Sequence, residues 1–410
     1  MELRDYQPAD WGDVRSFLRA HWRPNHPLTD LDVFRWQFTG FGGSGQPVSQ
    51  VAVDGRKVVG FLGGIPGLYR CGDEVAPGVA FDVWIVDPQI QNRGLGLLLM
   101  KALEDRFPAC CSLGVNPKVV HYYTRRGYRH GDRLYRWVVP LRMDGCQRLI
   151  ASAPEPGSTT ASATAPPAVS VALAAPPARH TAAFVRPLVE AHARLLEAPA
   201  AAVEPMPRPD PAALAELHVR STAQWLRFGL HRTAEFWTWR YLHCPVYEYL
   251  FFGAPAGPGV VVARVEAIVS PDRPVVHGLN VLRLIELLPA RPETWNGGAD
   301  GPFTELLAGV LMWAIEAGCV LADFQHSSPR LAGLLEWLGF APQNAAAAPV
   351  FAAVPPLFAP LRYNVGPINY VFRSPSGGGD GPSLDPRDVY LVKSDAGMDR
   401  PHVWSPAAAE

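Results

Sequence analysis

The sequence predicts an α/β protein built from two related halves, and three observations support this prediction. Strand-like runs rich in β-branched residues alternate with helix-like runs whose apolar residues recur every three to four positions. The same order of motifs occurs twice along the chain, at separations of 202 and 212 residues. A stretch without aromatic residues separates the two copies. The 410 residues suffice for two or three domains, and 48% hydrophobic with 18% charged residues is typical of a globular protein.

In the first half, residues 58–65 and 78–86 are expected to be strands, and residues 96–107 a helix. The second strand ends at Asp87-Pro88, a pair that favours a turn. The turn continues as Gln91-Asn92-Arg93-Gly94-Leu95-Gly96. The first N–H groups of a helix have no partner inside it and carry the positive end of its dipole, and glycines let a phosphate approach the main chain. The segment is therefore either an anion site or an ordinary tight turn.

The second half repeats this order with differences. Residues 260–268 and 282–288 are expected to be strands, and residues 303–317 a helix. No Q-x-x-G-x-G motif follows the second strand; a glycine-rich insertion occupies residues 296–301 instead. The position four before Gly339 is leucine, whereas the matching position of the first half is tyrosine. We expect that this copy has lost the anion site.

Two pairs of similar segments support the duplication. The aromatic run Phe34-Arg35-Trp36-Gln37-Phe38 is echoed by residues 236–241, and residues 122–128 are echoed by residues 334–340. Their offsets are nearly constant, which favours duplication over coincidence.

The composition also predicts the domain boundaries. Of the thirty residues 151–180, twenty-four are Ala, Pro, Ser, Thr or Gly. Such a segment cannot bury enough apolar surface to offset its ordering entropy, which predicts a flexible linker. The expected division is a first domain over residues 1–145, a linker over 146–184 and a second domain over 185–410.

Charge and cysteine usage exclude several classes of function. With 37 Lys and Arg against 38 Asp and Glu, the chain has no basic excess for nucleic acid or an anionic membrane surface. The six cysteines form no C-x-x-C pair, and no motif has the spacing of a metal site. A charged amino-terminal segment and the absence of long apolar runs predict a cytoplasmic protein. The oligomeric state is not predicted.

One combination of motifs is more specific than its parts. The first half has the order Val86-Asp87-Pro88-x-x-Gln91-x-x-Gly94-x-Gly96, then a strand, Asn116, and a helix carrying Tyr123-x-x-x-Gly127-Tyr128. Over residues 50–140 this order resembles the GNAT superfamily of acyl-CoA N-acyltransferases. The repeat makes the chain similar to tandem GNAT proteins, which implies two domains, each a mixed, mostly antiparallel sheet flanked by helices. Residues 239–245 and 395–401 resemble two-domain members that act on amino sugars.

The resemblance implies a binding site for an acyl-CoA cosubstrate. The pyrophosphate would rest on the main-chain N–H groups that open the helix, the pantetheine arm would pair with the end of the preceding strand, and a downstream asparagine would contact the cofactor. The residues implied are Val86, Gln91, Asn92, Arg93, Gly94, Leu95, Gly96 and Asn116.

The resemblance also implies catalytic roles. Tyr123 matches the tyrosine that protonates the departing thiolate, and a phenol with an ordinary pKa near 10 can donate that proton. Asp82 and His121 are the candidates for the general base; the alternatives are a carboxylate held by the main chain or an arginine, and a histidine on a helix surface or packed. Tyr122 is expected in the core.

The second half is expected to shape the acceptor pocket, with Glu286, Asp323 and His326 as candidate substrate-binding residues; each has an alternative as a loop or core-edge polar group. The predicted function is N-acylation of a primary amine on a small molecule, first an amino sugar or sugar nucleotide, then a natural-product or peptide amine. Two alternatives stay open. One is a non-catalytic acyl-CoA-binding or scaffold protein. The other is an aminoacyl-tRNA-dependent transferase, which the balanced charge disfavours.

Overall fold

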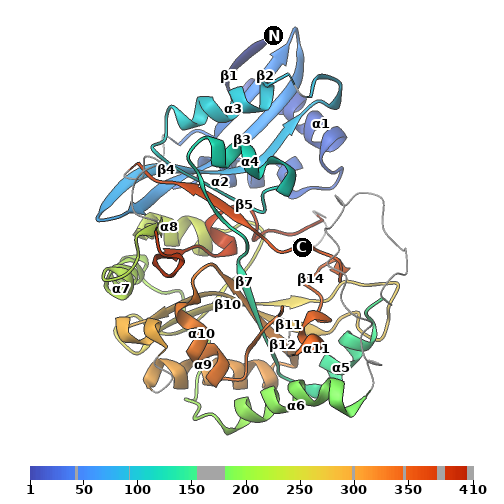
Figure 1. Cartoon of the computed structure of the whole chain (residues 1–410), viewed down its shortest axis with the longest axis vertical. Coiled ribbons are helices and arrows are strands. Elements are labelled where there is room, and N and C mark those ends of the chain that lie inside the picture. Colours follow the sequence, from blue (N-terminus) through green and yellow to red (C-terminus); the bar gives the residue numbers. More distant parts are fainter. Residues whose placement is uncertain are drawn as a thin grey trace. The chain divides into compact units, whose positions relative to one another are not determined.

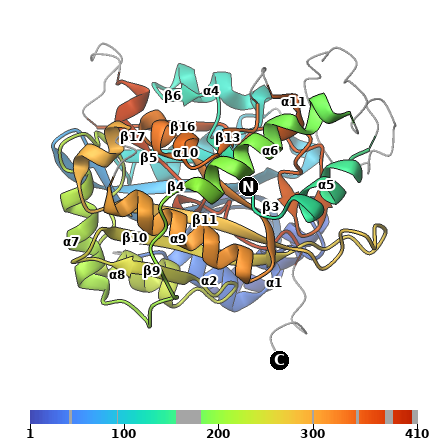
Figure 2. The ribbon, with the colours of Figure 1, turned by 90° about the horizontal axis from the view of Figure 1, so that it is seen from below.

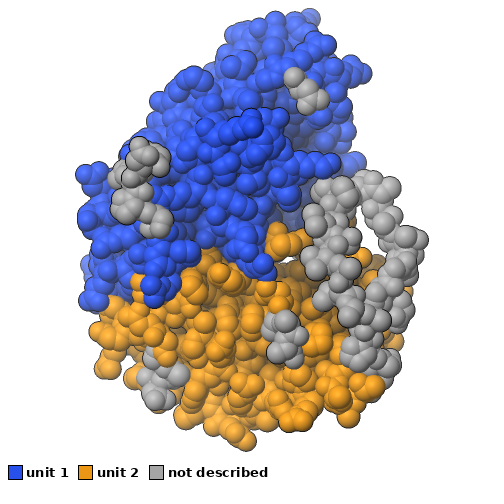
Figure 3. Space-filling model, in the orientation of Figure 1, with its two compact units in different colours: residues 1–134, 210–249, 368–410 blue, residues 135–209, 250–367 orange. Residues whose placement is uncertain are grey.

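The computed structural model describes residues 1–41, 45–91, 93–154, 181–297, 301–344, 348–375 and 384–403. The chain forms two compact units, which Figure 3 colours separately. Unit 1 comprises residues 1–134, 210–249 and 368–410, and unit 2 comprises residues 135–209 and 250–367. Both are mixed α/β structures, as the sequence predicts.

Unit 1 is built on a nine-stranded sheet in which seven strands follow the order β1-β2-β3-β4-β5-β16-β6. The strands β17 and β8 pair with each other, and β8 also pairs with β3. Most neighbours are antiparallel, but β4 and β5 are parallel, as are β8 and β17. The strands are β1 (Glu2–Asp5), β2 (Val48–Asp54), β3 (Lys57–Cys71), β4 (Glu74–Val86), β5 (Ala109–Leu113), β6 (Arg129–Gly131), β8 (Phe228–Leu230), β16 (Tyr370–Arg373) and β17 (Val389–Tyr390).

Helices flank this sheet (Figure 1). On one side, Leu95, Leu99 and Leu103 of α3 join Leu62 of β3 and Phe81 of β4 in a buried cluster, which is the face that the apolar periodicity predicts. The α-helices are α1 (Trp11–His21), α2 (Leu31–Thr39), α3 (Leu95–Glu104), α4 (Val120–Arg125), α7 (Pro211–Thr222) and α8 (Ala234–Trp237). Single turns of other helix types are η1 (Pro8–Asp10), η2 (Pro27–Thr29), η3 (Pro88–Ile90), η4 (Pro117–Val119), η5 (Thr238–Leu242), η8 (Pro386–Asp388) and η9 (Lys393–Asp395).

Unit 2 is built on a six-stranded sheet in the order β13-β7-β12-β11-β10-β9, and here β11 and β12 are the parallel pair. A separate two-stranded hairpin is formed by β14 and β15. The strands are β7 (Tyr135–Pro140), β9 (Leu250–Ala254), β10 (Gly259–Ala267), β11 (Asn280–Pro289), β12 (Cys319–His326), β13 (Ala341–Pro342), β14 (Leu357–Phe358) and β15 (Leu361–Arg362).

The helices of unit 2, seen from below in Figure 2, pack on this sheet. Leu149 and Leu188 from two of them join Val138 of β7 and Leu321 of β12 in a buried cluster. The helices are α5 (Met143–Ala151), α6 (Ala182–Glu197), α9 (Pro302–Glu316), α10 (Ala332–Trp337) and α11 (Pro349–Ala352), with the turns η6 (Pro292–Asn296) and η7 (Pro329–Leu331).

The predicted division at residues 145 and 185 differs from these units. The strand β7 belongs to the first half of the chain, yet it pairs with β12 and β13 of unit 2. Conversely, β16 of the second half pairs with β5 and β6 of unit 1. Residues 210–249, also from the second half, belong to unit 1. The two units therefore differ from the contiguous boundaries, because the sheet of unit 2 includes β7 from the first half of the sequence and the sheet of unit 1 includes β8, β16 and β17 from the second half.

The linker prediction is only partly within the described residues. Residues 155–180 lie outside them. The ends of the expected segment are helical, since α5 extends to Ala151 and α6 begins at Ala182. Thr181 caps α6 by accepting a hydrogen bond from the main-chain N–H of Phe184 at 3.3 Å. In the described part of the chain, no helix is both long enough and apolar enough to cross a bilayer.

Candidate functional site

The strand β4 carries an irregularity at the point where it leaves β5. Leu62 of β3 pairs with Trp84, and the next residue, Gly63, pairs with Asp82, so Val83 is an extra residue. Its φ of 54° is rare for a β-branched side chain, and such outliers cluster at functional sites.

The parallel ladder between β4 and β5 ends at this irregularity. Its last pair is Phe81 with Ser112. Beyond it, residues 82–86 have no strand partner on that side among the described residues. We call the space between residues 82–86 and residues 113–116 the β4–β5 opening. An extended ligand arm can pair with this exposed edge.

The turn after β4 is held by its own side chains. Asp87 accepts a hydrogen bond from the N–H of Gln89 at 3.0 Å and an ion pair from Lys57 at 2.8 Å, and these interactions lower the pKa of the Asp87 carboxyl. The side chain of Gln91 donates to the carbonyl oxygen of Val86 at 3.2 Å. The turn is thereby closed on the end of β4, and Asn92 lies outside the described residues.

The start of α3 has the features of an anion site. Gly94 has a φ of 79°, and a Cβ built on it would meet nothing within 4 Å. Within the described part of the chain, no acceptor is bonded to the main-chain N–H groups of residues 93–96; the first bond to Gly94 is made by the N–H of Leu98, at 3.2 Å. No acidic residue occupies the first turn. These amides are therefore available to an anion.

Gly96 also packs closely against β4. A Cβ at this position would lie 3.0 Å from the ring of Trp84, so the glycine is needed for close packing of α3 on β4. The indole Nε1 of Trp84 is buried and has no acceptor among the described residues. The sequence analysis did not include Trp84 among the site residues. Its position two residues after Asp82, on the strand that leads to the glycine turn, is the signal that could have identified it.

Tyr123 lies at the end of the β4–β5 ladder. Its ring packs against Phe81 (6.5 Å between centroids) and edge-on against Trp84 (5.8 Å), and the side chain is 2% exposed. Burial raises the pKa of the Tyr123 phenol above its ordinary value, and a hydrogen bond with Ser112 opposes this only in part. The phenol is therefore in its neutral, proton-donating form. Ser112 in turn donates to the carbonyl oxygen of Phe81 at 3.2 Å.

Asp82 is held by two other side chains. Its Oδ2 accepts hydrogen bonds from Gln37 of α2, at 2.5 Å, and from Nη1 of Arg400. Its Oδ1 accepts from Nη2 of Arg400 at 3.3 Å. The side chains of Asp82 and Arg400 are 10% and 9% exposed. The sequence leaves Asp82 as either a general base or a carboxylate held by the main chain or an arginine, and the structure contains the arginine partner.

The other residues near the opening are more exposed. His121 and Tyr122 lie on the surface of α4 with their rings 3.9 Å apart, so the expectation that Tyr122 is a core residue is wrong. Asn116 follows β5; its Oδ1 accepts a hydrogen bond from the N–H of Lys118 at 3.0 Å and thereby caps η4. The structure thus gathers Val86, Gln91, Arg93 and the start of α3 at one end of the opening.

The three acceptor candidates lie inside unit 2. Glu286 and His326 are fully buried, and Asp323 is 2% exposed. Asp323 lies between Arg136 and Arg283, each 2.7 Å from one of its carboxylate oxygens. These ion pairs give Asp323 a structural role, and the predicted contact of the three residues with a substrate stays a prediction.

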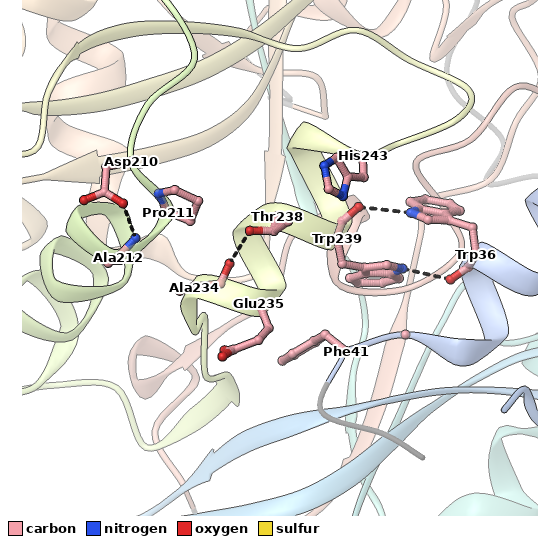
Figure 4. Close-up of a pocket in the computed structure, with 11 residues that line it drawn as sticks. Trp36, Phe41, Asp210, Pro211, Ala212, Ala234, Glu235, Thr238, Trp239 and His243 are labelled. Atoms are coloured by element: carbon pink, nitrogen blue, oxygen red, sulfur yellow. Dashed lines mark hydrogen bonds between the residues drawn. The ribbon is translucent and has the colours of Figure 1, made fainter. Parts of the chain in front are cut away.

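A separate groove of about 610 Å³ opens in unit 1 (Figure 4). The rings of Trp36 and Trp239 stack at 5.3 Å, and each indole N–H donates to the main-chain oxygen of the other, at 3.0 and 2.8 Å. Phe41 stacks on Trp239 at 5.6 Å. None of the site residues predicted from the sequence borders it. Its lining is Trp36, Gly40, Phe41, Asp210, Pro211, Ala212, Ala234, Glu235, Thr238, Trp239 and His243.

Comparison with known proteins assigns the first part of the chain to a family. The acetyltransferase (GNAT) family matches residues 11–128, which contain the opening, the glycine turn and Tyr123. These residues form a GNAT domain. No curated protein sequence matches it significantly.

Three solved structures resemble the fold. N-myristoyltransferase from Saccharomyces cerevisiae, solved with bound myristoyl-CoA, is 14% identical over 98% of this chain and 85% of its own, with a TM-score of 0.51. GCN5-related N-acetyltransferases from Kribbella flavida (15% identity) and Anabaena variabilis (12%) each cover 91% of this chain and 72% of their own, with TM-scores of 0.48. The yeast match extends over both units, so the GNAT-like fold is present twice.

Proposed function

We propose that this GNAT protein transfers the acyl group of an acyl-CoA to a primary amine of a small molecule, by direct attack of the amine on the thioester. One observation carries the proposal: the open main-chain amides at the start of α3 and the buried phenol of Tyr123 belong to the same β4–β5 opening.

The residues present fit the cosubstrate. Among the described residues, the amides of residues 93–96 have no acceptor, a Cβ at Gly94 would meet nothing within 4 Å, and the side chain of Arg93 is exposed. The edge of β4 up to Val86 is unpaired on the side of β5, and the buried indole N–H of Trp84 lacks an acceptor among the described residues. A diphosphate and an extended amide-containing arm would satisfy these donors. Asn116 and the turn closed by Gln91 complete the proposed binding site.

Tyr123 is proposed as the general acid. When the amine nitrogen bonds to the thioester carbon, the carbon–sulfur bond breaks and the thiolate takes the phenolic proton. The amine gives up a proton to water, which returns one to the phenolate. Because burial raises the pKa of Tyr123, the acid stays protonated above pH 10 and activity is not expected to fall at that pH through loss of this proton. Neither Asp82 nor His121 is needed as a base in this scheme.

The acceptor is proposed to be an amino sugar or a sugar nucleotide. The two segments whose sequences suggest that class contact each other in unit 1. Arg240 donates to the main-chain oxygen of Asp399 at 2.9 Å, and its guanidinium lies 3.8 Å from the Asp399 carboxylate. Natural-product and peptide amines are the next class.

Thiol release from a panel of acyl-CoAs, each offered with amino sugars, sugar nucleotides and simple amines, tests the proposal. We expect thiol release that depends on both substrates and an acylated amine in the products. A protein that binds acyl-CoA yet releases no thiol with any amine would contradict the proposal and favour the non-catalytic binding protein.

A further inference from the structure

We infer that residues 397–400, which we call the terminal segment, form a wall of the acyl-transfer site on its acceptor side, and that Asp82 and Arg400 are a positioning pair that holds this wall in place. The inference rests on the proposed function for its kinetic part. Neither residue then acts as an acid or base.

The residues around the terminal segment are anchored on both sides. Before it, Asp395 forms a fully buried ion pair with Arg232, at 2.9 Å. After it, the carbonyl oxygen of His402 accepts a hydrogen bond from Arg23 at 3.3 Å.

Asp399 anchors the terminal segment from within. Its carboxylate accepts a hydrogen bond from the hydroxyl of Tyr249 at 2.8 Å, and its main-chain oxygen accepts one from Arg240 at 2.9 Å. Asp399 is 1% exposed, so these bonds form away from water, where the loss of a partner is costly.

The terminal segment crosses the two strands where they part. A Cβ on Gly397 would collide with the carboxylate of Asp82 and the guanidinium of Arg400, so the main chain lies directly against that pair. On the other strand, a Cβ on Gly114 would lie 3.1 Å from Cε and 3.2 Å from Sδ of Met398. Asp82 is the first residue of β4 beyond the last β4–β5 pair, and Gly114 follows β5 directly. The segment therefore borders the inner end of the opening.

The wall lies on the opposite side of β4 from Tyr123. Phe81 and Trp84, which contact Tyr123, belong to the same side of the strand, whereas Asp82 contacts α2 through Gln37. An acyl group whose sulfur lies near Tyr123 thus has the terminal segment on its far side, where the amine must approach.

The bonds of Asp82 fit positioning better than proton transfer. Oδ2 already accepts two hydrogen bonds and Oδ1 accepts one, so few lone pairs are left to receive a proton. Arginine binds a carboxylate through two parallel N–H groups, which fixes direction as well as distance. Because the pair is nearly buried, removing either partner leaves the other charge unpaired, at a cost that exceeds that of a surface pair.

A double-mutant cycle separates the two roles. Asp82→Asn, Arg400→Ala and the double variant are compared by thiol release, with the KM of each substrate measured separately. A positioning pair predicts that each single variant loses about tenfold or more in kcat/KM for the amine, that the double variant loses no more than the worse single one, and that the KM for acyl-CoA is unchanged. Arg400→Lys restores part of the activity. The exposed Arg387→Ala, with its partner Asp385, is the matched control.

Hydrogen exchange of the terminal segment gives a readout independent of catalysis. We expect its amides to exchange about tenfold or more faster in Asp82→Asn and Arg400→Ala than in the wild type and in Arg387→Ala.

Each outcome decides a different point. Asp82→Asn could lose nearly all activity and the acidic limb of the pH–rate profile while Arg400→Ala stays active. That result would make Asp82 the base and overturn the inference. If the amides of the terminal segment exchange faster in both variants but thiol release is unchanged, this segment is not a wall of the acyl-transfer site. If the amides of the terminal segment exchange at the wild-type rate in both variants, Asp82 and Arg400 do not hold this segment in place. If the wild type releases no thiol with any pair, the proposed function fails, and exchange alone then decides whether the pair holds the segment.

Discussion

The helices α4 of unit 1 and α10 of unit 2 end in the same way, although they carry different chemistry. Each is followed by a glycine with a φ of 83°, Gly127 and Gly339. In both, the N–H of the next residue donates to the carbonyl of the residue four before the glycine, which is Tyr123 in unit 1 (3.1 Å) and Leu335 in unit 2 (2.9 Å). The two helices share this cap because it depends on the main chain and not on the side chain at the matched position.

The helices α3 and α9 differ where they begin. In α9, Pro302 has no N–H, and the N–H groups of Thr304 and Glu305 are bonded to the carbonyl of Gly301 at 3.0 and 3.2 Å. The carboxylate of Glu305 also lies in the first turn, where it repels an anion. Both helices have the bond from the fourth N–H to the glycine carbonyl, but the start of α3 has no proline, no acidic residue and, among the described residues, no bonded N–H at its third position. The comparison supports the proposal that the first copy, and not the second, binds the diphosphate.

The largest effect is expected at the matched position of α4 and α10. Tyr123→Phe should lower kcat about a hundredfold, because it removes the proton donor, and should leave the affinity for acyl-CoA unchanged. Single-turnover thiol release and acyl-CoA titration measure the two quantities. Tyr122→Phe and Leu335→Met are the matched controls and should retain full kcat. Full activity of Tyr123→Phe would end the proposed role.

Stability in acid should test the burial of His326 at the end of β12 in unit 2. Burial lowers the pKa of His326 to about 3, so the unfolded chain binds a proton that the folded chain does not between pH 6.5 and 3. The free energy of unfolding then falls as the pH is lowered from 6.5. For this residue the loss is about 2 kcal/mol at pH 5. Urea unfolding of His326→Asn at pH 7 and pH 5 should show a smaller difference than the wild type; an equal difference would refute the assignment.

A negative charge at the start of α3 should weaken acyl-CoA binding, whereas the negative charge at the start of α9 should not affect it. Gly94→Asp should raise the Kd for acyl-CoA about tenfold relative to Gly94→Asn, because the two side chains tolerate a positive φ similarly but only one repels a diphosphate. Isothermal titration measures both. Removing the charge of α9 in Glu305→Gln should leave the Kd unchanged. Equal Kd values for the two Gly94 variants would place the diphosphate elsewhere.

The smallest effects concern the caps of η4 and η7. Asn116 and Ser328 each accept a hydrogen bond from the N–H two residues ahead, at 3.0 and 3.3 Å. Asn116→Ala and Ser328→Ala should each lower the free energy of unfolding by about 1 kcal/mol in urea titrations. Only Asn116→Ala should also weaken acyl-CoA binding. If Asn116→Ala and Ser328→Ala change the affinity for acyl-CoA by similar amounts, the cap, and not contact with the cofactor, is the whole role of Asn116.

Local sequence patterns predicted the elements that form the proposed acyl-CoA site. The helix expected over residues 96–107 is α3, and the strand expected over residues 78–86 is the second part of β4. These predictions succeed because a helix start after glycine and a strand before Asp87-Pro88 depend on neighbouring residues. The same patterns could not show that Gly96 is needed for contact with Trp84, because that contact depends on how α3 packs on β4.

The sequence by itself determined the family-like order of motifs, the duplication and the loss of the tyrosine in the second copy, because each is a matter of residue type at a fixed spacing. Tertiary structure alone decided which half supplies which strand, since only the completed sheets select the partners of β7 and β16. It also decided that Arg400, 318 residues away in the chain, binds Asp82. Such a pairing depends on long-range packing, which no local pattern records.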